Sequence, residues 1–300
     1  MSLLDVVHRI FGQRVDSFEM TLEHNRAMAL AVRDDNPIHC DEVAARKANY
    51  EHTPALGIHL ILLAEEHLDE LRHDLSKNGR SGYELARLAV KVPHPVYPGQ
   101  RVQFLCNDDD NYVENEHEVR FSFRGVVFGG TPEHLPVIES EAWLTHQPIS
   151  FRPLPSVHYR KREPITGESL DIINGIIGRK RRDIVPYGMV AASFVSALLD
   201  LGKRAVAVQY GPQHPMHNYG VIRSLELCPY ARPMIGSTLE SSLYVRRRRP
   251  QNDLGPYLYT VEGLVQEIVT SKEGAEEKAP LLFGELRCVS SINFSKVYEQ

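Results

Sequence analysis

The stretch TPALGIHLILLAEEHLDEL, residues 53–71, gives the first indication of the fold. Thr53 can cap the N-terminus of a helix, and Pro54 suits the first helical position. The first half of the stretch is apolar on all sides, which predicts a buried helix. The second half gains acidic residues and is expected to emerge into water; these are Glu65, Glu66, Asp69 and Glu70. The stretch therefore predicts a central helix whose apolar part must be covered by other elements.

Strand candidates follow this helix at residues 86–92, 101–106, 118–128 and 136–145, and they are short and rich in β-forming residues. Val119, Phe121 and Phe123 alternate with polar residues, which is typical of a half-buried antiparallel strand. A buried helix followed by such strands predicts an antiparallel sheet wrapped around the helix.

The same order recurs in the second half of the chain. A second apolar helix is expected from about residue 185 to 201, followed by strands at 221–227, 238–247, 257–269 and 281–290. Prolines cluster near residues 147–156 between the halves and indicate a linker. We therefore predict an α+β protein of two related units, residues 1–150 and 151–300, each with one long helix wrapped by an antiparallel sheet.

Composition, charge and cysteine spacing argue against several classes of protein. The net charge of -5 argues against nucleic acid as the main partner. The four cysteines lie far apart and include no C-x-x-C pair, so we expect neither a metal site nor a disulfide framework. No apolar run is long enough to span a membrane, and the N-terminus lacks the apolar core of a signal peptide. The sequence thus predicts a cytoplasmic protein.

The first unit carries the sequence DDNPIH at residues 34–39, and the second unit has no counterpart of it. Asn36 before a proline disfavours helix and favours a turn. Such a turn can bring the side chains of Asp34 and His39 together, and a carboxylate beside an imidazole suits general acid/base catalysis. On the alternative interpretation, Asp34 and Asn36 merely cap a helix that begins near Asp41.

These six residues resemble the hydratase-2 motif of MaoC-like (R)-specific enoyl-CoA hydratases and dehydratases. The segment PVYPG, residues 95–99, resembles the Pro-Val-x-Pro-Gly turn of the same family. The resemblance implies the hotdog fold, in which an antiparallel sheet wraps a long central helix, and two units imply its double form. It also implies a lyase of fatty acid metabolism that hydrates a 2-enoyl thioester or dehydrates a 3-hydroxyacyl thioester.

The resemblance further implies which residues form the catalytic site. Asp34 and His39 would act on water and on the α-carbon of the substrate, and Asn36 would help to hold the pair. The amide of Gly57, at the start of the central helix, would bind the thioester oxygen. No metal and no cofactor other than the coenzyme A of the substrate are implied.

The sequence departs from the family pattern at two places. The family usually has Ser-Gly before the first aspartate, where this chain has Val32 and Arg33. It usually has His before the helix glycine, where this chain has Leu56. We expect further substrate contacts from residues beside the two helix starts, namely His59, Tyr187 and Gly188. Two basic runs could bind the phosphates of coenzyme A, through Arg181 in the first and Arg246 in the second.

Two other functions stay open at this point. A hotdog thioesterase would also use a carboxylate and a helix-start amide, although it typically lacks the Asn-Pro-x-His arrangement. A non-catalytic acyl-CoA-binding protein would fit the altered residues next to the motif. The expected partner is an acyl-CoA or acyl-carrier-protein thioester, and the expected state is a monomer or a homodimer.

Overall fold

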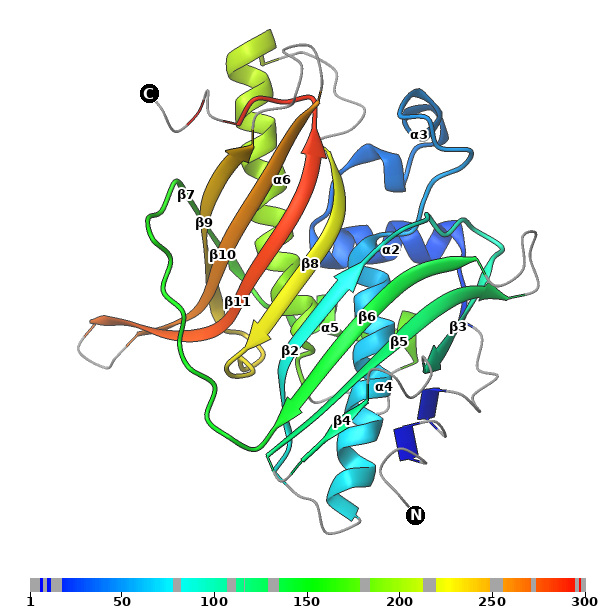
Figure 1. Cartoon of the computed structure of the whole chain (residues 1–300). Coiled ribbons are helices and arrows are strands. Elements are labelled where there is room, and N and C mark those ends of the chain that lie inside the picture. Colours follow the sequence, from blue (N-terminus) through cyan, green and yellow to red (C-terminus); the bar gives the residue numbers. More distant parts are fainter. Residues whose placement is uncertain are drawn as a thin grey trace.

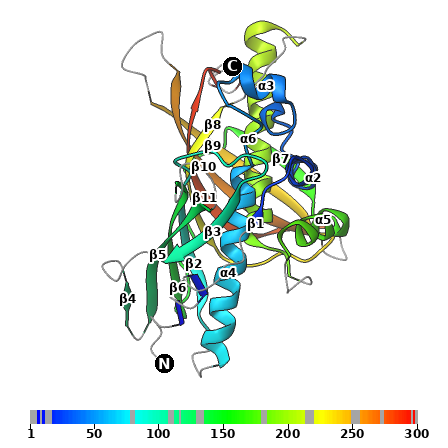
Figure 2. The same cartoon turned by 90° about the vertical axis from the view of Figure 1, so that its right-hand side faces the viewer.

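The computed structural model describes residues 6–7, 10–11, 18–77, 82–106, 112–115, 117–128, 135–178, 184–212, 220–248, 256–270, 274–294 and 297. Two long helices dominate this part of the chain, α4 (Gly57–Lys77) and α6 (Tyr187–Tyr210). Figure 1 shows both helices packed on the same side of one curved sheet, and Figure 2 shows this layering from the side. The expected central helix is therefore present in each half.

The sheet is antiparallel at every described pairing and runs through both halves in the order β1-β3-β5-β6-β2-β8-β11-β10-β9-β7. The strands of the first half are β1 (Phe18–Glu19), β2 (Glu84–Lys91), β3 (Arg101–Cys106), β4 (Val113–Glu114), β5 (Glu118–Phe128) and β6 (Pro136–Thr145). Those of the second half are β7 (Tyr159–Pro164), β8 (Val221–Pro229), β9 (Thr238–Arg248), β10 (Tyr257–Thr270) and β11 (Glu276–Ser290).

The two halves have the same strand order, reflected about the β2–β8 pair, where Val90 lies opposite Leu225. Shorter helices also correspond: α2 (Leu22–Val32) and α5 (Gly167–Ile177) precede the long helices and pack against each other. The first half adds a 3₁₀ turn, η1 (Pro37–His39), and α3 (Glu42–Lys47). The predicted internal repeat is thus present in the topology, and the predicted alternation in β5 is confirmed because Val119, Phe121 and Phe123 are buried.

The predicted start of the first central helix is wrong. The helix begins at Gly57, so Thr53 does not cap it and Pro54 is not its first residue. The segment before Gly57 stays outside the helix because its backbone groups bind elsewhere. The amide of Ala55 donates to the carbonyl of Val96 at 2.7 Å, and the carbonyl of Pro54 accepts from His39 and Asn25.

The prediction that the second half of this helix emerges into water is also wrong for two of its carboxylates. Glu65 and Asp69 are buried. Glu65 accepts hydrogen bonds from the amides of Tyr187, at 2.7 Å, and Gly188, at 2.8 Å, which begin α6. The first amides of a helix have no partner within the helix and carry partial positive charge, so a carboxylate is stabilised there.

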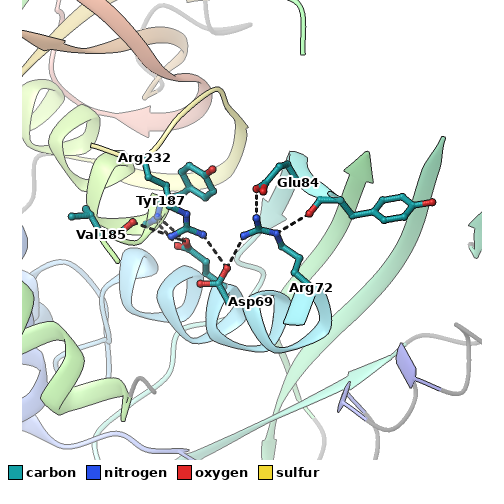
Figure 3. A network of polar contacts seen from close by, with 9 residues as sticks. Asp69, Arg72, Glu84, Val185, Tyr187 and Arg232 are labelled. Carbon is teal, nitrogen blue, oxygen red and sulfur yellow. Dashed lines mark hydrogen bonds and ion pairs between the residues drawn. The ribbon is translucent and has the colours of Figure 1, made fainter. Parts of the chain in front are cut away.

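Arg232 balances these buried charges. Its guanidinium lies 3.1 Å from Glu65 Oε1 and 2.9 Å from Asp69 Oδ1. It also donates to the carbonyl of Val185 at 2.9 Å and lies over the ring of Tyr187. Figure 3 shows Asp69 between the guanidinium groups of Arg232 and Arg72. The two halves are therefore joined in the interior by a charged network as well as by the shared sheet.

The close contact between α6 and the sheet depends on two glycines. Gly263 of β10 lies directly opposite Gly284 of β11. The ring of Phe194 fills the space above them, and a Cβ atom on Gly263 would lie 2.4 Å from that ring. The absence of side chains at this cross-strand pair lets α6 approach the sheet, which a larger residue would prevent.

Removal of the Glu65 carboxylate should strongly destabilise the fold. Glu65→Ala would leave the Arg232 charge and two helix amides short of a buried partner, and a loss of about 3–5 kcal/mol is expected. Urea unfolding would measure it. The matched control is Glu19→Ala, which removes an exposed partner of Arg101 and should cost at most about 1 kcal/mol. Equal losses in the two variants would contradict this role of Glu65.

Candidate active site

The turn that carries the motif is built by the end of α2. Arg33 caps this helix in the left-handed conformation, with φ 54°. The chain then reverses, and the amide of Asp34 donates to the carbonyl of Ala29 at 2.9 Å. Asp34 Oδ1 accepts from the amide of Asn36 at 3.0 Å, an Asx-turn that orients the carboxylate. The helix-cap interpretation holds only for Asp41, whose side chain accepts from Val43 at the start of α3.

The structure brings His39 and Asp34 together. His39 Nδ1 lies 2.8 Å from the carbonyl oxygen of Pro54, so this nitrogen carries a proton and donates it. The other ring nitrogen, Nε2, lies 3.9 Å from Asp34 Oδ2. A water or hydroxyl oxygen placed between these two atoms would be within hydrogen-bond reach of both. The bond to Pro54 thus fixes which nitrogen of His39 faces the carboxylate.

The segment that receives His39 is itself fixed from two sides. Pro54 also accepts a hydrogen bond from the buried amide group of Asn25, at 3.3 Å. Ala55 is bound to Val96, which belongs to the PVYPG turn singled out in the sequence. Gly99 closes that turn with φ 87° and donates to Met20. The PVYPG turn therefore affects the motif indirectly, because it holds the segment Pro54–Ala55 that positions His39.

Asp34, Asn36, His39 and Gly57 line one cavity of about 370 Å³, the size of a small-molecule site. Gly57 is the first residue of α4, and a Cβ atom built on it would meet no other atom within 4 Å. Among the residues that the structure describes, none accepts a hydrogen bond from its amide. A partial positive charge at this helix start therefore lies at the cavity that the Asp34–His39 pair also lines.

The residues that line the cavity are of two kinds. Asn49, His94 and Arg223 are polar and exposed, and Tyr50 is partly buried. Most of the buried lining is apolar, and six of these residues are Ile61, Val195, Leu198, Leu225, Cys288 and Phe294. Both halves of the chain supply apolar lining residues. The Asp34–His39 pair thus belongs to the first half, while the second half forms much of the wall.

Burial raises the pKa of Asp34 above its ordinary value of 3.8. The loss of hydration is the largest cause, and the neighbouring carboxylate of Asp35 acts in the same direction. His39, the amide of Asn36 and Lys203 oppose the shift. A raised carboxyl pKa in a cavity is typical of groups that exchange protons in catalysis.

Some residues expected to contact substrate do not line this cavity. The amides of Tyr187 and Gly188 are occupied by Glu65, so the start of α6 is closed to a ligand. His59 is fully buried in α4, and burial lowers its pKa to about 3, so it stays neutral. Arg246 is bound to Glu262 on the sheet. Arg181 lies outside the described residues.

Other lining residues were not anticipated from the sequence. Tyr50 and Arg223 are among them, and burial raises the pKa of the Tyr50 hydroxyl. Cys288 and Phe294 belong to the buried lining. None of the four belongs to a recognisable motif, and they meet at the cavity only through the tertiary structure. His94 was the exception with a signal, because it directly precedes the PVYPG turn.

No three His, Cys, Asp or Glu side chains within the described part of the chain come close enough together to hold a metal ion. None of its helices is both long enough and apolar enough to cross a membrane.

The wrapped helices, the shared sheet and the duplicated order define a double hotdog fold. Solved structures with this arrangement cover nearly the whole chain. A protein of Chloroflexus aurantiacus assigned as a MaoC domain dehydratase aligns with a TM-score of 0.62 and 11% identity, over 92% of this chain and 93% of that one. A MaoC-like dehydratase aligns with a TM-score of 0.57 and 11% identity, over 92% and 96%.

A conserved hypothetical protein of Mycobacterium tuberculosis with a double hotdog fold aligns with a TM-score of 0.56 and 10% identity, over 90% of this chain and 93% of that one. The sequence itself matches no family model and no curated protein. At these identities the likeness establishes the fold, and the expected double hotdog with MaoC-like structural neighbours is confirmed at that level.

Replacement of Asp34 should stabilise the protein at neutral pH. Because the folded-state pKa of Asp34 is raised, the folded chain holds its proton more tightly than the unfolded chain, and stability falls as pH rises through the shifted pKa. Asp34→Asn removes this penalty. Urea unfolding should therefore show the variant to be more stable than the parent at pH 7, with a smaller difference near pH 4. Asp35→Asn should show a smaller gain, because it leaves the buried Asp34 carboxyl in place, removes only a minor cause of its raised pKa and also breaks the pair with Lys203.

Proposed function

We propose that this protein is a hydratase or dehydratase that interconverts a 2-enoyl thioester and a 3-hydroxyacyl thioester. The observation that carries the proposal is the meeting of Asp34, His39 and the Gly57 amide at one cavity. These groups supply a base, an acid and an oxyanion donor, which are what the addition of water to a polarised double bond needs. The double hotdog fold shared with MaoC-like dehydratases supports it.

In the hydration direction, the Asp34 carboxylate takes a proton from water as the water oxygen bonds to the β-carbon. Protonated His39 keeps its Nδ1 proton in the hydrogen bond to the Pro54 carbonyl and donates its Nε2 proton to the α-carbon. General acid/base assistance of this kind contributes about 10²–10⁴-fold to the rate. Dehydration runs through the same groups in reverse, so each group changes its role between acid and base.

The thioester oxygen gains negative charge during either reaction. The amide of Gly57, the first residue of α4, can donate a hydrogen bond to this oxygen. One such donor contributes about 10²–10³-fold to the rate. The corresponding amides of α6 are closed by Glu65, so the duplicated fold offers this donor once. The proposed enzyme therefore has a single active site, assembled in the first half of the chain.

The character of the cavity supports an apolar acyl group as substrate. Apart from Asp34 and Asn36 of the motif, its buried lining consists of hydrocarbon side chains and the thiol of Cys288. A dicarboxylic acyl chain would place an unpaired charge among these apolar residues, which is strongly unfavourable. The exposed lining residues Arg223 and His94 are left for the thiol-bearing part of the substrate, coenzyme A or an acyl carrier protein.

Hydration of crotonyl-CoA and longer 2-enoyl-CoA thioesters tests the proposal. Asp34→Asn should lower kcat by at least about 10²-fold because the base is lost, with the fold retained. Loss of enoyl absorbance without release of free thiol is the expected result for the parent. Thiol release would show a thioesterase instead, and binding without turnover would show a non-catalytic role. Full activity of Asp34→Asn would contradict the assignment of Asp34 as the general base.

Phe294 should set the longest acyl chain that the cavity accepts. It is a buried lining residue of the cavity, its ring centroid lies 4.5 Å from that of Tyr259, and its amide donates to the Tyr259 hydroxyl. Phe294→Ala should extend the cavity, and each further buried methylene should improve affinity by about fourfold. Titration with saturated acyl-CoAs of increasing length measures this. Phe283→Ala, a buried truncation outside the cavity, should leave the length preference unchanged.

A further inference from the structure

The turn that carries Asp34 is held by the second half of the chain. Arg33, directly before Asp34, has a left-handed backbone, which is uncommon for a residue with a side chain. Its guanidinium crosses to β7, where Nη1 lies 3.5 Å from Glu163 Oε2 and Nη2 lies 3.4 Å from the carbonyl oxygen of Pro164. On the other side of Asp34, the carboxylate of Asp35 is bound to Lys203 of α6.

The backbone of the turn is held as well. The hydroxyl of Ser196, on α6, lies 3.4 Å from the carbonyl oxygen of Arg33 and 3.4 Å from Glu163 Oε2. It accepts a hydrogen bond from Lys161 Nζ at 2.6 Å. The single hydroxyl proton of Ser196 can be donated to the Arg33 carbonyl or to Glu163, and Glu163 also pairs with Lys161 and Arg33. Glu163 and Ser196 are buried, where such bonds are strongest.

We propose that Arg33 and Ser196 are positioning residues, through which the second half fixes the Asp34 carboxylate for the proposed acid/base reaction. The inference rests on the proposed function for its kinetic consequence, but the geometric consequence is independent of it. We call the contacts of Arg33 with β7 and of Ser196 with the Arg33 carbonyl the clamp. With the clamp intact, the Asp34 amide keeps its bond to the Ala29 carbonyl, and the Asn36 amide keeps its bond to the Asp34 carboxylate. Without it, the turn should open more often and Asp34 should meet His39 less often.

The chain offers a matched pair for the first test. Ser193 and Ser196 lie one turn apart on α6 and are equally buried, but Ser193 accepts a hydrogen bond from Ser241 of β9 instead of contacting the turn. Ser196→Ala should lower kcat for enoyl-CoA hydration by about two- to tenfold, the range expected for one hydrogen bond. KM should stay unchanged because substrate contacts are kept. Ser193→Ala should leave kcat unchanged.

Arg33→Gly separates the side chain from the backbone conformation. Glycine adopts the left-handed conformation without strain, so the backbone conformation at residue 33 should be kept in this variant. The two side-chain contacts with β7 are lost. A lower kcat at unchanged KM would show that the side chain positions the turn. Parental kcat in Arg33→Gly would show that the residue serves only as a helix cap, and it would overturn the proposal for Arg33.

Amide hydrogen exchange gives a readout that does not need activity. Exchange at Asp34 and Asn36 should become about two- to tenfold faster in Ser196→Ala and Arg33→Gly, and stay parental in Ser193→Ala. The same acceleration in the Ser193 variant, or none in the other two, would overturn the clamp. If the parent hydrates no thioester and exchange still changes as expected, the clamp stands and the proposed function falls. If hydration occurs but neither kcat nor exchange responds, the clamp alone falls.

Discussion

The carboxylate of Glu65 binds the first amides of α6, and much of the arrangement depends on this one contact across the halves. It places a negative charge in the interior, which requires the guanidinium of Arg232, and Asp69 shares that guanidinium. A buried charge is tolerated only when it is paired and hydrogen-bonded, so these groups constrain one another. The contact joins α4 to α6 and also decides that the second helix start cannot receive a ligand.

The duplicated fold is therefore symmetric in its sheet and asymmetric in its chemistry. Both halves have the same strand order and one long helix. The start of α4 opens to the cavity at Gly57, whereas the start of α6 is closed. The second half then takes other roles: it supplies part of the apolar lining of the cavity, and through Ser196 and Glu163 it contacts the turn before Asp34. A single site built from both halves is the result.

Local patterns predicted the elements well where one face of each is buried. The strands 101–106, 118–128 and 136–145 have the predicted bounds, since alternation and turn residues determine them locally. The start of α4 lies three residues after the predicted one, because Pro54 and Ala55 are held by side chains and backbone distant in sequence. The burial of Glu65 could not be predicted either, because its partners lie in the other half.

By itself the sequence determined two helix-and-strand units, an acid/base motif confined to the first, and a helix-start glycine downstream of it. These are local properties of hydrophobic period and turn chemistry. Only the tertiary structure decided which helix start is open, which nitrogen of His39 faces Asp34, and which residues close the cavity. Each of these depends on contacts between segments far apart in sequence, such as Glu65 with Gly188 or His39 with Pro54, for which no local pattern exists.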